Sequence, residues 1–232
     1  MPGDPRRTYI LWERPRRCVL ARPKPRFLLT LAAVLAGLAA APIDEGRVKS
    51  LVFPEARLEE IRALGPAVLP VLASLYERSG ESDRAGIASV FYALGWPSPD
   101  AKRVLLRDLH TPDENLRLQA QWAIGRVSAD PDVMDALLDT MRNDGNPLFR
   151  DKAACALAHD QIHLSEPQKL RLFERLIDAL GDPKEQVRDI ALKALVIHTG
   201  QSKGFSPSGS DAERDAAIKE WRRWLERYRS AM

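Results

Sequence analysis

Three stretches of the chain repeat one pattern of apolar and polar residues, and this repetition constrains the possible folds more than any other feature. Each stretch has an apolar pair, a polar break, an apolar residue followed by arginine, and then Ala-x-x-Ala-(Ile/Leu). Self-similarity at a period of this length is typical of stacked pairs of helices, so the sequence predicts an all-α array. The stretches begin at Leu105, Leu137 and Leu176, and their arginines, 33 and 38 residues apart, are Arg117, Arg150 and Arg188.

The residues between the apolar segments carry signals that start helices. A polar side chain can accept a free backbone N–H at the start of a helix, and proline at the next position loses no hydrogen bond there. Five such pairs are Ser98-Pro99, Thr111-Pro112, Asp130-Pro131, Asn146-Pro147 and Asp182-Pro183. The capping-box spacing, in which the third helical residue reaches back to the cap, occurs at Thr111 with Glu114, Ser165 with Gln168, Asp182 with Glu185 and Ser210 with Glu213.

Because no segment sustains the alternation of apolar and polar residues that marks a strand, we expect helices throughout. Residues 42–54 are expected to form a linker and residues 55–64 a short helix. The paired helices are predicted at 66–78 with 82–94, 99–109 with 113–127, 131–142 with 147–159, and 166–180 with 184–198, followed by a last helix at 211–229.

With these residues in view, the chain resembles the HEAT repeat family, especially the short bacterial HEAT-like type that also occurs in phycobilin lyases. The resemblance covers residues 64–199 and rests on the order apolar-Leu-x-x-Leu, Asp-Pro turn, Val-Arg and Ala-x-x-Ala-Leu, most complete over residues 176–195. The first repeat departs from this order, since Ile87 stands where the arginine would be. The resemblance implies a right-handed α-solenoid of about four antiparallel helix pairs that binds other macromolecules.

The repeated arginine has a place in such a stack. Positions 0, +3, +4 and +7 from it lie on one face of the helix, and this face is otherwise mostly small or apolar. A charged side chain on a packed face needs a partner. As in the resembled family, we expect each arginine to reach an aspartate between helices or carbonyl groups. The structural set is therefore Arg117, Arg150, Arg188 and the turn residue Asp182.

The opposite face of each second helix carries positions +1, +5 and +9, at which the repeats differ. In the resembled family the second helices line the concave surface, so Trp122, Cys155 and Lys193 would form one column across three repeats. The nine residues are Leu118, Trp122 and Arg126, then Asp151, Cys155 and His159, and then Asp189, Lys193 and Ile197. The candidates for binding a partner are Trp122, Arg126, Asp151, His159, Asp189 and Lys193.

Trp122 has two interpretations at this position. An exposed tryptophan on a helix face is a plausible anchor for a partner protein. A tryptophan that lies flat against the adjacent helix only packs, and burial explains most aromatic side chains. A largely buried Trp122 would exclude the anchor.

No pattern in the sequence indicates catalysis. His159 and His163 have the i, i+4 spacing of a zinc-protease helix, but the third ligand that catalytic zinc requires has no motif support. No histidine precedes glutamate, the pair that deoxyhypusine hydroxylases, which are iron enzymes built from HEAT repeats, use as ligands. Cys155 is expected to be a packing residue. We predict no catalytic residue, no metal and no cofactor.

The N-terminal residues differ in charge from the rest of the chain. Residues 1–41 hold eight Lys/Arg and two Asp/Glu, whereas residues 42–232 hold 27 Lys/Arg and 30 Asp/Glu. Residues 27–41, FLLTLAAVLAGLAAA, carry no charge; they are short for a membrane span but typical of the apolar core of a secretory signal. We expect a cleaved export signal and a periplasmic or extracellular protein, with an uncleaved membrane anchor, or neither, as the alternatives.

The chain is thus expected to have four parts. These are a basic leader over 1–41, a linker and short helix over 42–63, HEAT-like repeats over 64–199, and a loop with a C-terminal capping helix over 200–232. In the last helix Trp221, Trp224 and Tyr228 form a stripe that would cover the end of the array.

The predicted function is non-enzymatic: a scaffold that binds another protein on its concave surface. One alternative is an enzyme or enzyme-accessory protein of the phycobilin-lyase type. The other is a nucleic-acid-binding array, which the mildly acidic repeats disfavour because phosphate binding needs clustered positive charge. A membrane would be contacted only through the N-terminal segment.

Overall fold

The computed structural model describes residues 43–232, and these residues are helical over 72 % of their length with no strand among them. The helices are α1 (Glu45–Val52), α2 (Leu58–Ala63), α3 (Val68–Glu77), α4 (Glu81–Leu94), α5 (Pro99–Arg107), α6 (Glu114–Val127), α7 (Pro131–Asn143), α8 (Pro147–Cys155), η1 (Ala156–Asp160), α9 (Glu166–Ala179), α10 (Glu185–Thr199) and α11 (Asp211–Ser230). The predicted leader over 1–41, including the apolar segment 27–41, lies outside the described residues.

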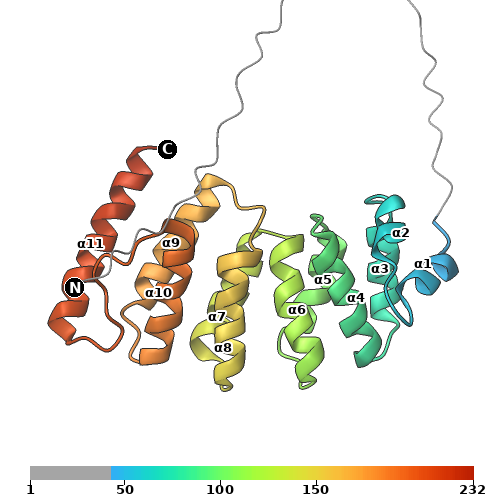
Figure 1. The fold of residues 1–232 in the computed structure, drawn as a ribbon, viewed down its shortest axis with the longest axis horizontal. Helices are drawn as coiled ribbons and strands as arrows, with labels where there is room; N and C mark the ends of the chain where they lie inside the picture. Colours follow the sequence, from blue (N-terminus) through green and yellow to red (C-terminus); the bar gives the residue numbers. More distant parts are fainter. Residues whose placement is uncertain (1–42) are drawn as a thin grey trace, which may run out of the picture. The chain divides into compact units, whose positions relative to one another are not determined.

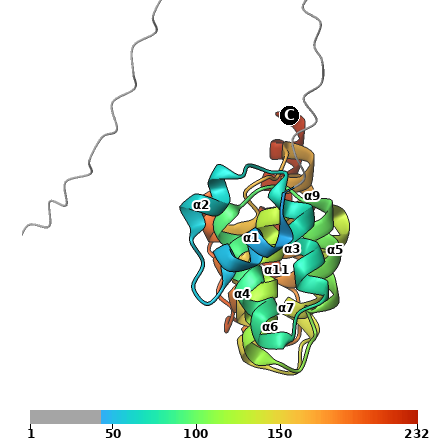
Figure 2. The same cartoon turned by 90° about the vertical axis from the view of Figure 1, so that its right-hand side faces the viewer.

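From α3 onward, the helices lie side by side in a row that follows the order of the chain (Figure 1). Within the row α3 packs on α4, α5 on α6, α7 on α8, and α9 on α10. The second helices also pack on one another, α4 on α6, α6 on α8, and α8 on α10. They form one continuous layer. Viewed along the row, α4 and α6 lie on one side and α3 and α5 on the other (Figure 2).

When α8 and η1 are taken together, the helix bounds from residue 66 onward agree with the predicted ranges to within two residues. Their accuracy comes from local capping. The Ser98 hydroxyl accepts the N–H of Ala101 at 3.1 Å, and the Asn146 side-chain oxygen accepts the N–H of Leu148 at 2.9 Å. Ser210 and Glu213 form the predicted capping box at the start of α11.

Two of the predicted cap residues lie two residues before the observed cap positions. The cap of α6 is Asp113 rather than Thr111, because its carboxylate accepts the N–H of Leu116 at 2.7 Å. Helix α10 begins after Lys184, and Asp182 instead stabilises the preceding turn by accepting the N–H of Lys184 at 3.0 Å. In both places the Pro belongs to the turn; only at α6 does a side chain nearer the apolar segment, that of Asp113, cap the helix.

The expected linker over 42–54 is also different, because it contains helix α1. The side chain of Asp44 accepts the N–H of Arg47 at 2.7 Å and so starts this helix. Val48, Leu51 and Val52 are spaced to share one helical face, and all three are buried. The helix packs against α2 and α3, so burial of this short apolar face explains its stability.

Helix α8 was predicted to continue regularly to residue 159, but it widens into the π-helical turn η1. Gly125 on α6 makes room for this turn. A Cβ atom at Gly125 would lie 3.2 Å from both the Asp160 Cβ and the Gln161 Nε2 atoms, which is closer than ordinary van der Waals contact. The absence of a side chain at Gly125 therefore allows the end of η1 to pack directly against α6.

Arginine side chains connect consecutive helix pairs. Arg117 on α6 donates from Nε to the Leu109 carbonyl oxygen at 3.0 Å and forms an ion pair with Asp144, which lies between α7 and α8. Its guanidinium carbon also lies 4.0 Å from the centre of the Phe149 ring. One side chain thus contacts its own helix pair and the following one.

The first pair uses the same type of contact from another position. Arg84, three residues before Ile87, lies 3.1 and 3.2 Å from the two carboxylate oxygens of Asp108. The Tyr76 hydroxyl donates to the same carboxylate at 2.6 Å. Although Ile87 departs from the repeated pattern, an arginine one helical turn earlier makes the connection to the next pair.

The later arginines contact mainly backbone oxygens. Arg150 donates to the Asp144 carbonyl at 2.6 Å and to the side-chain oxygen of Gln186 on α10 at 3.1 Å. Arg188 donates to the carbonyl oxygens of Asp182 and Pro183, each at 2.9 Å, and to that of Pro207 at 2.8 Å. The Pro207 contact ties the last pair to the loop that leads into α11.

We expect the substitution Arg117→Met to lower the free energy of unfolding by about 3–5 kcal/mol, because the nearly buried Asp144 carboxylate would lose its cation. Urea denaturation measures the change. The matched control is Arg103→Met, which removes an exposed ion pair with Glu77 and should cost less than about 1 kcal/mol. The double variant R117M/D144N should recover part of the loss; equal effects of R117M and R103M would contradict the structural role.

Candidate binding groove

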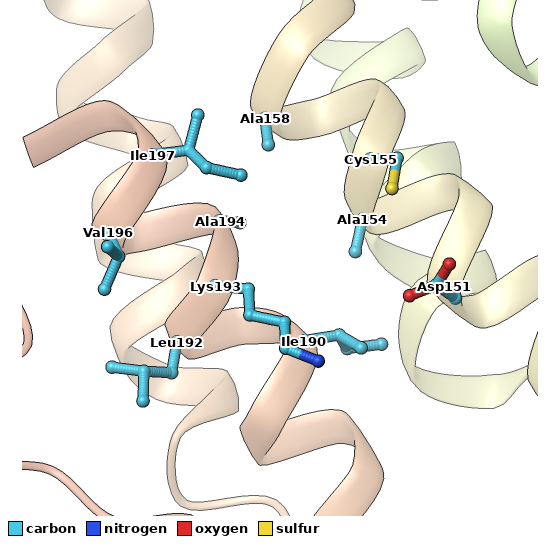
Figure 3. A pocket seen from close by; sticks show the side chains of 10 residues that line it. All are labelled: Asp151, Ala154, Cys155, Ala158, Ile190, Leu192, Lys193, Ala194, Val196 and Ile197. Carbon is cyan, nitrogen blue, oxygen red and sulfur yellow. The ribbon is translucent and has the colours of Figure 1, made fainter.

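An apolar groove lies between α8 with η1 on one side and α10 on the other. Its volume is about 320 Å³. Figure 3 shows the two walls, with Asp151, Ala154, Cys155 and Ala158 facing the α10 residues across an open gap. The residues that line the groove are Asp151, Ala154, Cys155, Ala158, Ile190, Leu192, Lys193, Ala194, Val196 and Ile197.

Small side chains explain why the two helices leave this space. The wall formed by α8 and η1 contributes Ala154, Cys155 and Ala158, none of which reaches far from its helix. The opposite wall contributes the longer Ile190 and Ile197, which point into the gap (Figure 3). Ile197 is 47 % exposed, so the groove offers water-accessible aliphatic surface of the kind that marks an interaction site.

The charged groups at the groove are paired within the chain. Asp151 lies 3.4 Å from Lys152, and Lys193 lies 2.7 Å from Asp189 on the next turn of α10. The hydrogen bond that Lys193 donates to Asp189 raises the pKa of Lys193, and burial raises the pKa of the Cys155 thiol. Lys193 is therefore cationic and Cys155 an uncharged thiol near neutral pH, and the groove has no net excess of charge.

The sequence candidates divide between this groove and the neighbouring helices. Asp151 and Lys193 line the groove. Asp189 is not part of the lining, but it forms an ion pair with Lys193. His159 is exposed on η1 but is not part of the lining. Trp122 and Arg126 lie on α6, away from the groove.

Trp122 and Arg126 pack against α4 instead. Trp122 is half-buried, and its ring centre lies 6.4 Å from that of Tyr92. The Arg126 guanidinium lies 4.4 Å from the centre of the same tyrosine ring, and its Nε atom is 3.4 Å from the Asp160 carboxylate. The three side chains fill the junction between α4 and α6, so most of the Trp122 contact area is used inside the chain.

The sequence analysis did not select the apolar residues of the groove as site residues. Ala154, Ala158 and Ala194 are indistinguishable in sequence from the alanines that close the stack. The sequence of α10 does contain a sign of the groove. Val196 and Ile197 continue its run of apolar residues onto a face that does not pack in the stack, and they are 37 % and 47 % exposed. Ile197 was placed at position +9 of the variable face but not counted among the candidates.

The described histidines and acidic residues do not gather into a metal site. Within residues 43–232 no group of three His, Cys, Asp or Glu residues is placed to hold an ion. His159 lies on η1, whereas His163 lies in the following loop, with its Nε2 atom 2.9 Å from the Gly95 carbonyl oxygen. The two imidazoles therefore belong to different local structures.

Polar groups are also buried where η1 meets α6. Asp160 is nearly buried, and desolvation raises the pKa of its carboxyl group although Arg126 partly offsets this effect. Gln121 and Gln161 are buried as well, and both atoms of each side-chain amide have no hydrogen-bond partner among the described residues. An unpaired buried amide lowers stability, so this junction is less favourable than the apolar contacts around it.

No protein-family model matches the chain, and no curated protein shows significant similarity to it. In the part of the chain that the structure describes, no helix combines the length and apolar character needed to cross a membrane. The groove is therefore the feature on which a functional argument can be built.

We expect Gln121→Met to raise the free energy of unfolding by about 1–3 kcal/mol, because it replaces an unpaired buried amide by an apolar side chain of similar shape. Gln119→Met, at a half-buried position on the same helix, is the control and should change stability by less than about 0.5 kcal/mol. Denaturant titration distinguishes the two. A loss of stability in Q121M would mean that the amide is hydrogen-bonded in solution.

Proposed function

We propose that this chain is a non-enzymatic binding module, a HEAT-like α-solenoid that holds another protein in the groove between α8 and α10. The proposal rests on the groove, which is concave and exposes aliphatic side chains. The charged side chains at its edge are neutralised by ion pairs within the chain. Protein-binding sites are depleted of charge at their centre and are surrounded by polar groups, and this surface has both properties.

The arrangement of the helices supports the solenoid. Each repeated arginine contacts the following pair or the loop that follows it, so stacking continues from one unit to the next. At the C-terminal end α11 packs on α9, and Trp221 of α11 is completely buried. Solenoids need such a terminal unit to cover their last apolar face. A right-handed superhelix, as in the resembled family, is part of the proposal.

The observations favour protein binding over the two alternatives. A phycobilin-lyase-type activity would need reactive groups, but Cys155 is an uncharged thiol among apolar residues. Nucleic-acid binding would need unpaired cations in a row, whereas the lysines at the groove face Asp151 and Asp189. Export through residues 27–41 is proposed with the binding function and would place the partner outside the cytoplasm.

The test uses the full-length chain as bait in extracts of its own cells, with captured proteins identified by quantitative mass spectrometry. Ile197→Asp places a charge on the exposed edge of the groove and should reduce recovery of the specific partner at least tenfold. That is about the effect of losing one important apolar contact, roughly 1.4 kcal/mol or more.

The matched control is Ile162→Asp, because Ile162 is 48 % exposed but lies outside the groove. It should recover the partner as well as the unchanged chain does. Circular dichroism confirms that both variants remain folded. If every captured protein is recovered equally with I197D and I162D, the groove is not the binding site.

A further inference from the structure

The groove lies where the chain departs from its own repeating pattern. Position +5 is the fifth residue after the repeated arginine, or after Ile87 in the first repeat. It is occupied by Tyr92 on α4, Trp122 on α6 and Cys155 on α8. Tyr92 packs in the junction of α4 with α6, and Cys155 lies at the junction of α8 with α10. The first of these junctions thus receives an aromatic ring, and the other receives a small thiol.

The junction between α4 and α6 shows what an aromatic ring does at this position. Tyr92 packs against Trp122 at 6.4 Å between ring centres and against the Arg126 guanidinium at 4.4 Å. Counted in the same register, Trp122 corresponds to Lys193 on α10, and Arg126 corresponds to Ile197. Both of these α10 residues line the groove.

A ring at position 155 would project into the groove, because Cys155 lines it. Cys155, Lys193 and Ile197 border the groove at the sequence positions that Tyr92, Trp122 and Arg126 hold at the junction of α4 with α6. Figure 3 shows Cys155 on one wall and Lys193 and Ile197 on the other, with the gap between them. The alanines at 154 and 158 leave the space open along the helix axis.

We propose that the groove accepts a phenylalanine or tyrosine side chain from the bound partner, which takes the position that Tyr92 occupies in the first junction. This inference rests on the proposed function and specifies the chemistry of the partner. The first junction supports this occupant, because the chain itself packs an aromatic ring there at the position that corresponds to Cys155.

The charges at the groove complement such a ring. Lys193 is 64 % exposed along its side chain and can place its ammonium over the ring face while it remains next to Asp189. A phenol hydroxyl entering toward the Asp151 end could donate to that carboxylate, and the ring body would contact Ile190 and Ile197. A tyrosine thus matches the apolar walls and both charged groups.

The direct test is titration of the ¹⁵N-labelled full-length chain with p-cresol, the side-chain analogue of tyrosine. Amide shifts of residues on α8, η1 and α10 should follow a single curve with a dissociation constant in the millimolar range, as expected for a small fragment. The non-aromatic analogue 4-methylcyclohexanol should bind at least threefold more weakly, because it has no ring face for Lys193.

Two variants decide whether the ring occupies the predicted space. Cys155→Tyr fills the groove from within and should weaken p-cresol binding at least tenfold, whereas Cys155→Ala keeps the space and should bind as the unchanged chain does. If C155Y is unfolded by circular dichroism, Lys193→Met provides the second measurement, since it should abolish the preference for p-cresol over 4-methylcyclohexanol.

Equal binding of p-cresol to C155Y and the unchanged chain, or shifts confined to other helices, would overturn the inference. So would equal affinity for the two analogues in the unchanged chain. The proposed function would survive any of these results if I197D still lost the captured partner. The proposed function alone would fail if p-cresol bound as expected but I197D and I162D captured the same proteins.

Discussion

The contacts of the second-helix arginines with the next unit are the constraint on which the rest of the structure depends. Arg117 is held by the Leu109 carbonyl, the Asp144 carboxylate and the Phe149 ring, so the distance between α6 and α8 is fixed by one side chain. A guanidinium can satisfy several acceptors at once because its donors lie in a rigid plane. Arg84 provides the same connection at the start of the array.

The side chain at position +5 contributes to whether a junction between second helices is filled or open. Tyr92 fills the junction of α4 with α6, where Trp122 and Arg126 surround it. Cys155 leaves the junction of α8 with α10 open, and the groove follows. The same order of helices thus gives a packed junction in one place and an open apolar groove in another.

Much of the helical structure was predictable because its signals are local. The apolar spacing gave the helix faces, and caps such as Ser98 and Asn146 gave their starts. The error at Thr111 arose where a second possible cap, Asp113, lies within one turn, whereas Asp182 closes the turn before α10 and does not cap the helix. The helix at 45–52 was missed because its short apolar face is stabilised by packing on α2 and α3, which the local pattern does not reveal.

The helical character of the chain, the positions of most of its helices and the faces that carry the repeated residues follow from the sequence, because they depend on neighbours within a few turns. Packing in three dimensions places Trp122 against Tyr92, whereas Cys155 borders an open groove. Those outcomes depend on contacts across a helix junction between side chains that are about 30 to 40 residues apart along the chain. The sequence pattern placed Trp122 and Cys155 in one column of residues. The neighbours of Trp122 fill its junction, whereas the side chains around Cys155 leave a groove open.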